Sequence, residues 1–152
     1  MDLYSIALFL HIVGALLVFV LLTIEGLALR FGFPYAQLNR ILGPVAALLV
    51  LVPGLYMMKV QWGWTGWVVT GLVAYVLIAT IGAYTGIRLM RGRMDAGAAI
   101  VSWLVRTGVA VAVVFDMSVK PNVVASVLAV LIGAALGGVG GMVAARRQAV
   151  QA

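Results

Sequence analysis

Four ionisable side chains lie well inside apolar stretches of this sequence, where a charged or titratable group is costly. His11 and Glu25 share the first apolar stretch, and Arg106 and Asp116 share the fourth. Inside a membrane, such groups can relay protons, bind ions or join helices by hydrogen bonds. His11 and Glu25 are fourteen residues apart, which at about 100° per residue places both on one stripe of a helix. These four residues are therefore the candidate functional set.

The other residues of the sequence limit the chemistry in which His11 can take part. His11 is the only histidine, and the chain has no cysteine. A metal site built from several histidines or thiolates within one chain is therefore excluded. A haem axial pair would need Met57 or Met117 beside His11, or His11 of a second copy. A serine hydrolase site is also not predicted, because Ser102 is expected on the opposite side of the membrane from His11. The sequence predicts no catalytic residue and no metal or cofactor, with haem at His11 as an alternative.

The composition is that of an integral membrane protein. Of the 152 residues, 65% are hydrophobic and 9% are charged, and the mean hydropathy is +1.20. A soluble domain needs a far more polar surface. The net charge of +6 does not indicate nucleic acid as a partner, because in a membrane protein the placement of charge matters more than its sum. The predicted partner is the lipid bilayer.

Five apolar segments are each long enough to cross a bilayer as a helix. They are residues 3–29, 41–58, 67–90, 98–119 and 123–145. The predicted fold class is an all-α membrane protein, a five-transmembrane-helix bundle that forms one domain over residues 1–152. We expect a non-helical interfacial segment over residues 30–40, because Pro34 interrupts it, and a tight turn over residues 59–67.

Glycines at four-residue spacing predict where the helices pack closely. Gly82 and Gly86 lie in the third span, and Gly133, Gly137 and Gly141 lie in the fifth. The fifth span is predicted to pack through its glycines. Two partners are open: a second copy of the chain, giving a homo-oligomer, or Gly82 and Gly86 of the same chain.

The basic residues predict the orientation of the chain, because lysine and arginine accumulate in cytoplasmic loops. Seven arginines fall on one side of the predicted spans and two lysines fall on the other. The arginines are Arg30, Arg40, Arg88, Arg91, Arg93, Arg146 and Arg147, and the lysines are Lys59 and Lys120. The predicted N-terminus is outside and the predicted C-terminus is cytoplasmic.

This orientation also predicts which buried groups share a depth. Glu25 and Arg106 both fall in the cytoplasmic half of their spans, so we expect them to form an ion pair. His11 and Asp116 both fall in the outer half, where a carboxylate could accept a hydrogen bond from the imidazole. The Glu25–Arg106 pair would either fix helix register or mark a pathway for ions or solutes.

Three short stretches resemble a group of small bacterial integral membrane proteins of uncharacterised function. They are residues 10–14 (LHIVG), 51–58 (LVPGLYMM) and 119–121 (VKP). The opening Leu-His-x-x-Gly pattern is also similar to the first helices of copper-resistance D-type membrane proteins and of small membrane protoporphyrinogen oxidases. The resemblance implies a location in the bacterial cytoplasmic membrane, and the oxidases imply a haem role for His11 alone.

The predicted function is that of a non-catalytic membrane subunit or self-associating helical bundle with a buried polar network. A larger membrane complex is a further possible partner. The first alternative is a proton-coupled or ion or solute transporter that uses Glu25, Arg106, His11 and Asp116. The second is a haem-linked membrane redox protein with His11 as ligand.

Overall fold

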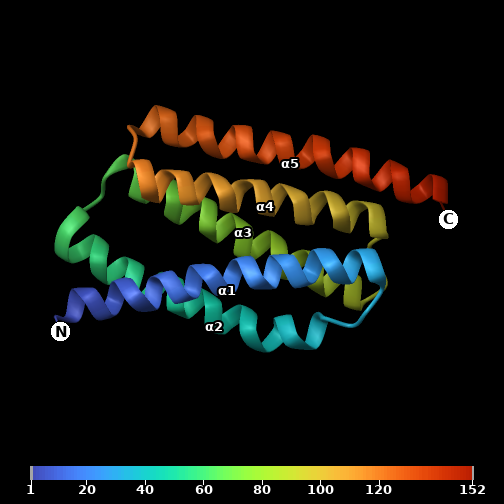
Figure 1. Cartoon of the computed structure of the whole chain (residues 1–152), viewed down its shortest axis with the longest axis horizontal. Coiled ribbons are helices and arrows are strands. Elements are labelled where there is room, and N and C mark those ends of the chain that lie inside the picture. The colour runs from blue at the N-terminus through green and yellow to red at the C-terminus, as the bar shows by residue number, and fades with distance from the viewer. Residues whose placement is uncertain (1, 152) are drawn as a thin grey trace. The chain divides into compact units, whose positions relative to one another are not determined.

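The structure, a computed structural model, describes residues 2–151 and consists of long helices joined by short connections (Figure 1). The helices are α1 (Leu3–Phe31), α2 (Ala36–Met57), α3 (Gly66–Met90), α4 (Ala96–Val119) and α5 (Val123–Gln151), and a π-helical turn, η1 (Met58–Trp62), follows α2 directly. Residues 2–151 contain no strand. The all-helical fold class is confirmed.

The described part of the chain contains five helices that are long and apolar enough to cross a membrane. Large apolar side chains are exposed along every one of them, among them Phe9, Leu48, Val73, Val111 and Leu136. Exposed apolar surface of this extent is costly in water and is normal where lipid is the solvent. The helices are those of a multi-pass membrane protein.

The chain forms two compact units. The first ends at Thr65 and contains α1, α2 and η1, and the second begins at Gly66 and contains α3, α4 and α5. The organisation of the whole chain as one domain stays a prediction.

The connection between α1 and α2 is shorter than predicted. α1 ends at Phe31 because Gly32 takes a left-handed conformation, with φ 73°, and its N–H bonds the Ala28 carbonyl at 2.8 Å. Glycine adopts this conformation without steric cost. The helix resumes at Ala36, since nothing after Pro34 opposes it. The prediction of a non-helical segment over residues 30–40 is therefore wrong at both of its ends.

The second connection is also shorter than predicted. The helix continues past Pro53, which lies inside α2, and through η1 to Trp62. It ends where Gly63 takes a φ of 62° and donates its N–H to the Met58 carbonyl at 2.7 Å. The predicted tight turn over residues 59–67 is reduced to residues 63–65. A proline ends a helix only when neighbouring contacts do not compensate for the missing donor.

The last two helices extend beyond the predicted spans. α4 begins at Ala96 because the Asp95 carboxylate caps it, accepting the Ala98 N–H at 2.8 Å. α5 begins at the predicted residue but continues past residue 145 to Gln151. The residues after 145 include two arginines and no glycine or proline, so no strong helix breaker follows.

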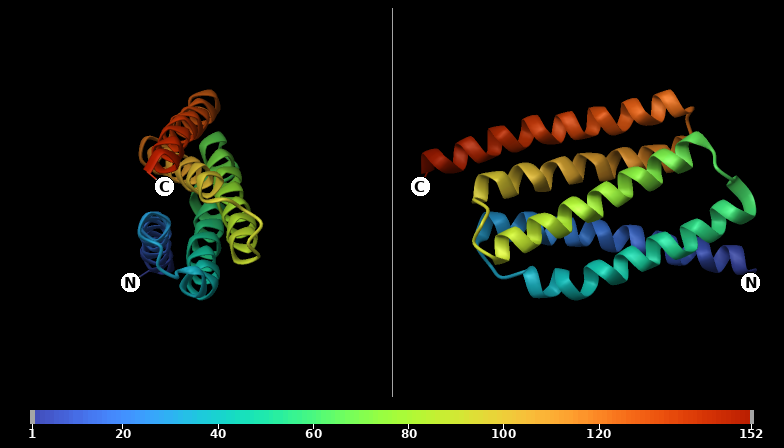
Figure 2. Two further views of the ribbon diagram at one scale, coloured as in Figure 1. Left: turned by 90° about the vertical axis from the view of Figure 1, so that its right-hand side faces the viewer. Right: turned by 180° about the vertical axis from the view of Figure 1, so that it is seen from behind.

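In the first unit, α1 and α2 pack side by side in opposite directions (Figures 1 and 2). The two backbones approach closely at Gly14, where a Cβ atom would lie 2.7 Å from the backbone carbonyl carbon of Leu49. At one end of this pair, Trp62 Nε1 donates to the Tyr4 hydroxyl at 3.3 Å. Gly14, three residues from His11, therefore lets the two helix backbones approach closely.

In the second unit, α4 and α5 are antiparallel neighbours along their length (Figures 1 and 2). Gly133 of α5 meets Gly108 of α4 backbone to backbone, and Gly137 meets the Leu104 carbonyl. At Gly141, a Cβ atom would lie 2.7 Å from the Val101 Cα. We call this glycine contact the α4–α5 seam. It brings the two backbones together because no side chain separates them.

Candidate functional site

The second unit contains a polar cluster between α3 and α4, centred on Arg106. Arg106 is 4% exposed, and its Nε donates to the Ser102 carbonyl one turn earlier, at 3.3 Å. The hydroxyls of Ser102 and Thr85 form a hydrogen bond of 2.7 Å across the two helices. Gly82 leaves room for the guanidinium, since a Cβ atom there would lie 3.0 Å from Arg106 Nη1. These four residues are called the Arg106 cluster below.

Asp116 is the second buried polar group of this unit, and its surroundings differ from those of Arg106. Both Asp116 on α4 and Ser126 on α5 have 0% exposure. Neither the two carboxyl oxygens nor the Ser126 hydroxyl has a hydrogen-bond partner among residues 2–151. A buried carboxyl without a partner is costly and is therefore a candidate for ligand or proton binding.

Apolar packing separates Asp116 from the Arg106 cluster. The two residues are ten positions apart on α4, about 15 Å along a helix axis. On α4, the buried residues between them are Val109, Ala110 and Ala112. On α3, Gly71 lies against Met117, the neighbour of Asp116, and Gly82 lies against Arg106. The buried residues between these two glycines are Ala74 and Ile78. Within the second unit as described, the two polar groups do not form one continuous polar path.

His11 makes its contact in the first unit, with α2. Its Nδ1 lies 2.8 Å from the Val50 carbonyl oxygen, so Nδ1 carries the hydrogen and Nε2 is the nitrogen left for any other role. Gly54 permits this approach, because a Cβ atom there would lie 3.1 Å from the imidazole. The sequence alone did not predict this contact.

Glu25 is buried in α1, at 4% exposure. It belongs to the first unit, whereas Arg106 belongs to the second. Each of the two predicted pairs, Glu25–Arg106 and His11–Asp116, would join a residue of the first unit to a residue of the second. Both pairs stay predictions.

The predicted packing glycines have different surroundings. Gly133, Gly137 and Gly141 lie on the α4–α5 seam, and Gly82 lies against Arg106, but a Cβ atom at Gly86 would meet nothing within 4 Å. The glycines of α5 therefore face α4, and the predicted alternative of a contact with Gly82 and Gly86 is wrong. Sequence reasoning missed Gly108, although it is the only glycine inside the predicted fourth span.

The described residues contain no group of three or more histidine, cysteine, aspartate or glutamate side chains that could hold a metal ion. Comparison with protein-family models, with curated proteins and with solved structures found no match.

Proposed function

We propose that this protein is a non-catalytic subunit or self-associating bundle of the bacterial cytoplasmic membrane, in which buried polar residues hold the helices together. The observation that carries the proposal is the hydrogen bond between Thr85 and Ser102 beside Arg106. Here polar groups bond to each other and to the helix backbone at a contact between two helices. Hydrogen bonds of this kind stabilise helix pairs in lipid.

The apolar packing between Arg106 and Asp116 favours this function over transport. A transport pathway needs binding groups that a solute or proton can reach in succession. In the second unit, buried alanine, valine and isoleucine side chains fill the interval between the two polar groups. The arrangement suits fixed helix contacts better than passage.

The proposed orientation places the N-terminus outside and the C-terminus in the cytoplasm. Successive membrane-crossing helices alternate in direction, so the connections after Phe31 and after Met90 belong on the same side as the end of α5. Seven arginines lie at or near these three places, and two lysines lie at the other ends. This asymmetry supports the orientation.

The proposed self-association uses a surface other than the fifth-helix glycines. Gly133, Gly137 and Gly141 are covered by α4 of the same chain. The exposed side of α5 carries large apolar residues such as Leu131, Leu136 and Val139, which lipid solvates as well as a partner helix does.

The sequence-based pairing of Glu25 with Arg106 remains part of the proposal, and both residues are buried. If the pair has a structural role, Glu25→Gln strands a buried charge and lowers the free energy of unfolding by about 3–5 kcal/mol. Replacing both residues together, with Gln at 25 and Met at 106, should restore most of the stability. Unfolding in detergent measures both variants, and a double variant no more stable than Glu25→Gln contradicts a structural pair.

Proton- or cation-coupled transport is the second candidate function, and Asp116 is the observation in its favour. A wholly buried carboxyl group without a hydrogen-bond partner among the described residues is typical of a proton or cation site inside a membrane. Proteoliposomes containing a pH-sensitive dye test it. A proton flux that is lost in Asp116→Asn, but kept in the control Asp95→Asn at the start of α4, would favour transport over the structural proposal.

A further inference from the structure

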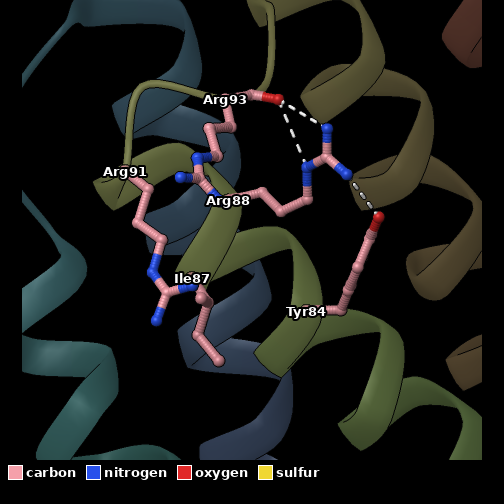
Figure 3. Close-up of a pocket in the computed structure, with 5 residues that line it drawn as sticks. All are labelled: Tyr84, Ile87, Arg88, Arg91 and Arg93. Atoms are coloured by element: carbon pink, nitrogen blue, oxygen red, sulfur yellow. Dashed lines mark hydrogen bonds between the residues drawn. The ribbon is translucent and has the colours of Figure 1, made fainter.

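A basic pocket of about 560 Å³ lies at the end of α3 and shares no residue with the Arg106 cluster (Figure 3). Its lining residues are Tyr84, Ile87, Arg88, Arg91 and Arg93. Three of these five residues are arginines, and none is acidic. The pocket lies where a membrane-crossing helix ends, which is the depth of lipid headgroups.

The backbone around the pocket is held by a Schellman motif at the end of α3. Gly92 takes a left-handed conformation with φ 61°. Its N–H bonds the Leu89 carbonyl at 3.0 Å, and the Arg93 N–H bonds the Arg88 carbonyl at 2.9 Å. This pattern closes the last turn of a helix and needs glycine at the left-handed position. It fixes the backbone positions of Arg91 and Arg93 on either side of Gly92.

The Arg88 side chain supports the same connection. Its Nη1 donates to the Tyr84 hydroxyl at 2.7 Å. Its Nε and Nη2 both donate to the Arg93 carbonyl, at 3.2 Å and 2.9 Å. Arg88 therefore acts as a positioning residue, and most of its donors are in use.

Arg91 and Arg93 differ from Arg88, because their guanidinium groups have no hydrogen bond or ion pair with any residue in the described range 2–151. Both residues are exposed. In Figure 3 the Arg88 guanidinium extends toward Tyr84, whereas those of Arg91 and Arg93 lie on the opposite side of the Arg88 side chain, and that of Arg91 lies next to Ile87. The pocket is thus lined by two further planar sets of charged donors, and such groups match the oxygens of a phosphate.

We propose that this pocket binds the phosphate of an anionic phospholipid, with Arg91 and Arg93 as its ligands and Arg88 as the positioning residue. An apolar side chain beside the arginines favours a lipid over free phosphate. Ile87 is 44% exposed within the pocket lining, so an acyl chain can lie against it while the headgroup meets the guanidinium groups. Clusters of basic residues at the end of a membrane helix are suited to such headgroups.

Native mass spectrometry of the full chain in a zwitterionic detergent tests the proposal. Dioctanoyl phosphatidylglycerol is titrated, with dioctanoyl phosphatidylcholine and inorganic phosphate in parallel experiments. Each arginine near an anionic headgroup contributes roughly fivefold in affinity, so R91Q/R93Q should bind phosphatidylglycerol about 30-fold more weakly. The single variant R91Q should lose about fivefold and provides the measurement if the double variant does not fold.

The matched control is R146Q/R147Q, which removes the same charge from two exposed arginines of α5. Its affinity for phosphatidylglycerol should stay at the wild-type value. Equal loss in both double variants, no loss in R91Q/R93Q, or phosphatidylcholine binding as tightly as phosphatidylglycerol would each overturn the proposal. Inorganic phosphate that binds as tightly as phosphatidylglycerol would overturn the lipid assignment and identify a free-anion site instead.

Discussion

The Nδ1 atom of His11 on α1 lies 2.8 Å from the carbonyl oxygen of Val50 on α2. Val50 is in the turn of α2 that precedes Pro53. Gly54 in the same turn has no side chain to block the imidazole. His11 thus joins α1 to α2 by a hydrogen bond from side chain to backbone, which is a structural role for the only histidine of the chain.

Replacing His11 should weaken the contact between α1 and α2. We expect His11→Leu to lower the free energy of unfolding by about 0.6–2 kcal/mol, because it removes an interhelical hydrogen bond in lipid. Thr23→Val is the control, since the Thr23 hydroxyl bonds only the Phe19 carbonyl of its own helix. Unfolding followed by tryptophan fluorescence compares them, and equal losses of stability would contradict a special role for His11.

The haem alternative makes a separate spectroscopic prediction. With Nδ1 bonded to Val50, only Nε2 of His11 is left to act as an axial ligand. If the alternative holds, protein made with full haem supply shows a Soret band that His11→Ala abolishes. A colourless wild-type preparation rejects haem binding, and a band unchanged in His11→Ala rejects His11 as its ligand.

The α4–α5 seam predicts that alanine substitutions at two adjacent glycines, Gly137 and Gly138, change the free energy of unfolding by very different amounts. Gly137→Ala places a Cβ atom against the Leu104 carbonyl, so the helices must separate, at a cost of roughly 1–3 kcal/mol. Gly138→Ala places its Cβ atom 3.7 Å from Val105 Cγ2, an ordinary contact. Alanine favours helix over glycine by about 1 kcal/mol, so this control should be neutral or stabilising. Similar unfolding free energies for the two variants would contradict the seam.

The start of α1 predicts a pH dependence outside the membrane-spanning segment. Hydrogen bonds from the hydroxyl and then the backbone N–H of Ser5 lower the pKa of Asp2 below its ordinary value of 3.8. The cap therefore stabilises the folded helix start fully above pH 3.8 and loses this contribution as the pH falls through the lower folded-state pKa. An NMR titration of the Asp2 carboxyl should have its midpoint below 3.8, and Ser5→Ala should raise it. A wild-type midpoint at or above 3.8 would refute the cap.

The sequence predicted the five spans well because each needs a long apolar run, and such runs are visible without the fold. It predicted the helix ends less well. Those ends depend on local caps, such as the left-handed Gly32 and the Asp95 carboxylate. In addition, the composition of a short polar segment does not decide whether that segment is helical.

The side-chain contacts were harder to predict than the spans. Thr85 on α3 and Ser102 on α4 are uncharged residue types that do not stand out in an apolar sequence. Their hydroxyls meet only because of how α3 is rotated against α4. The same holds for Gly108, whose role depends on which face of α5 it meets. By contrast, the rarity of charge in apolar helices made Arg106 and Asp116 visible from the sequence alone.

The central claim, that buried polar groups hold the helices together, is tested most directly by a double-mutant cycle on Thr85 and Ser102. Unfolding free energies are measured for Thr85→Val, Ser102→Ala and the combination, with a control cycle that pairs Thr80→Val with Ser102→Ala. Thr80 is exposed, and its hydroxyl bonds only carbonyls of α3. We predict a coupling of about 0.6–1.7 kcal/mol for Thr85 with Ser102 and none for the control. A coupling of zero, or one equal to that of the control cycle, would contradict this claim.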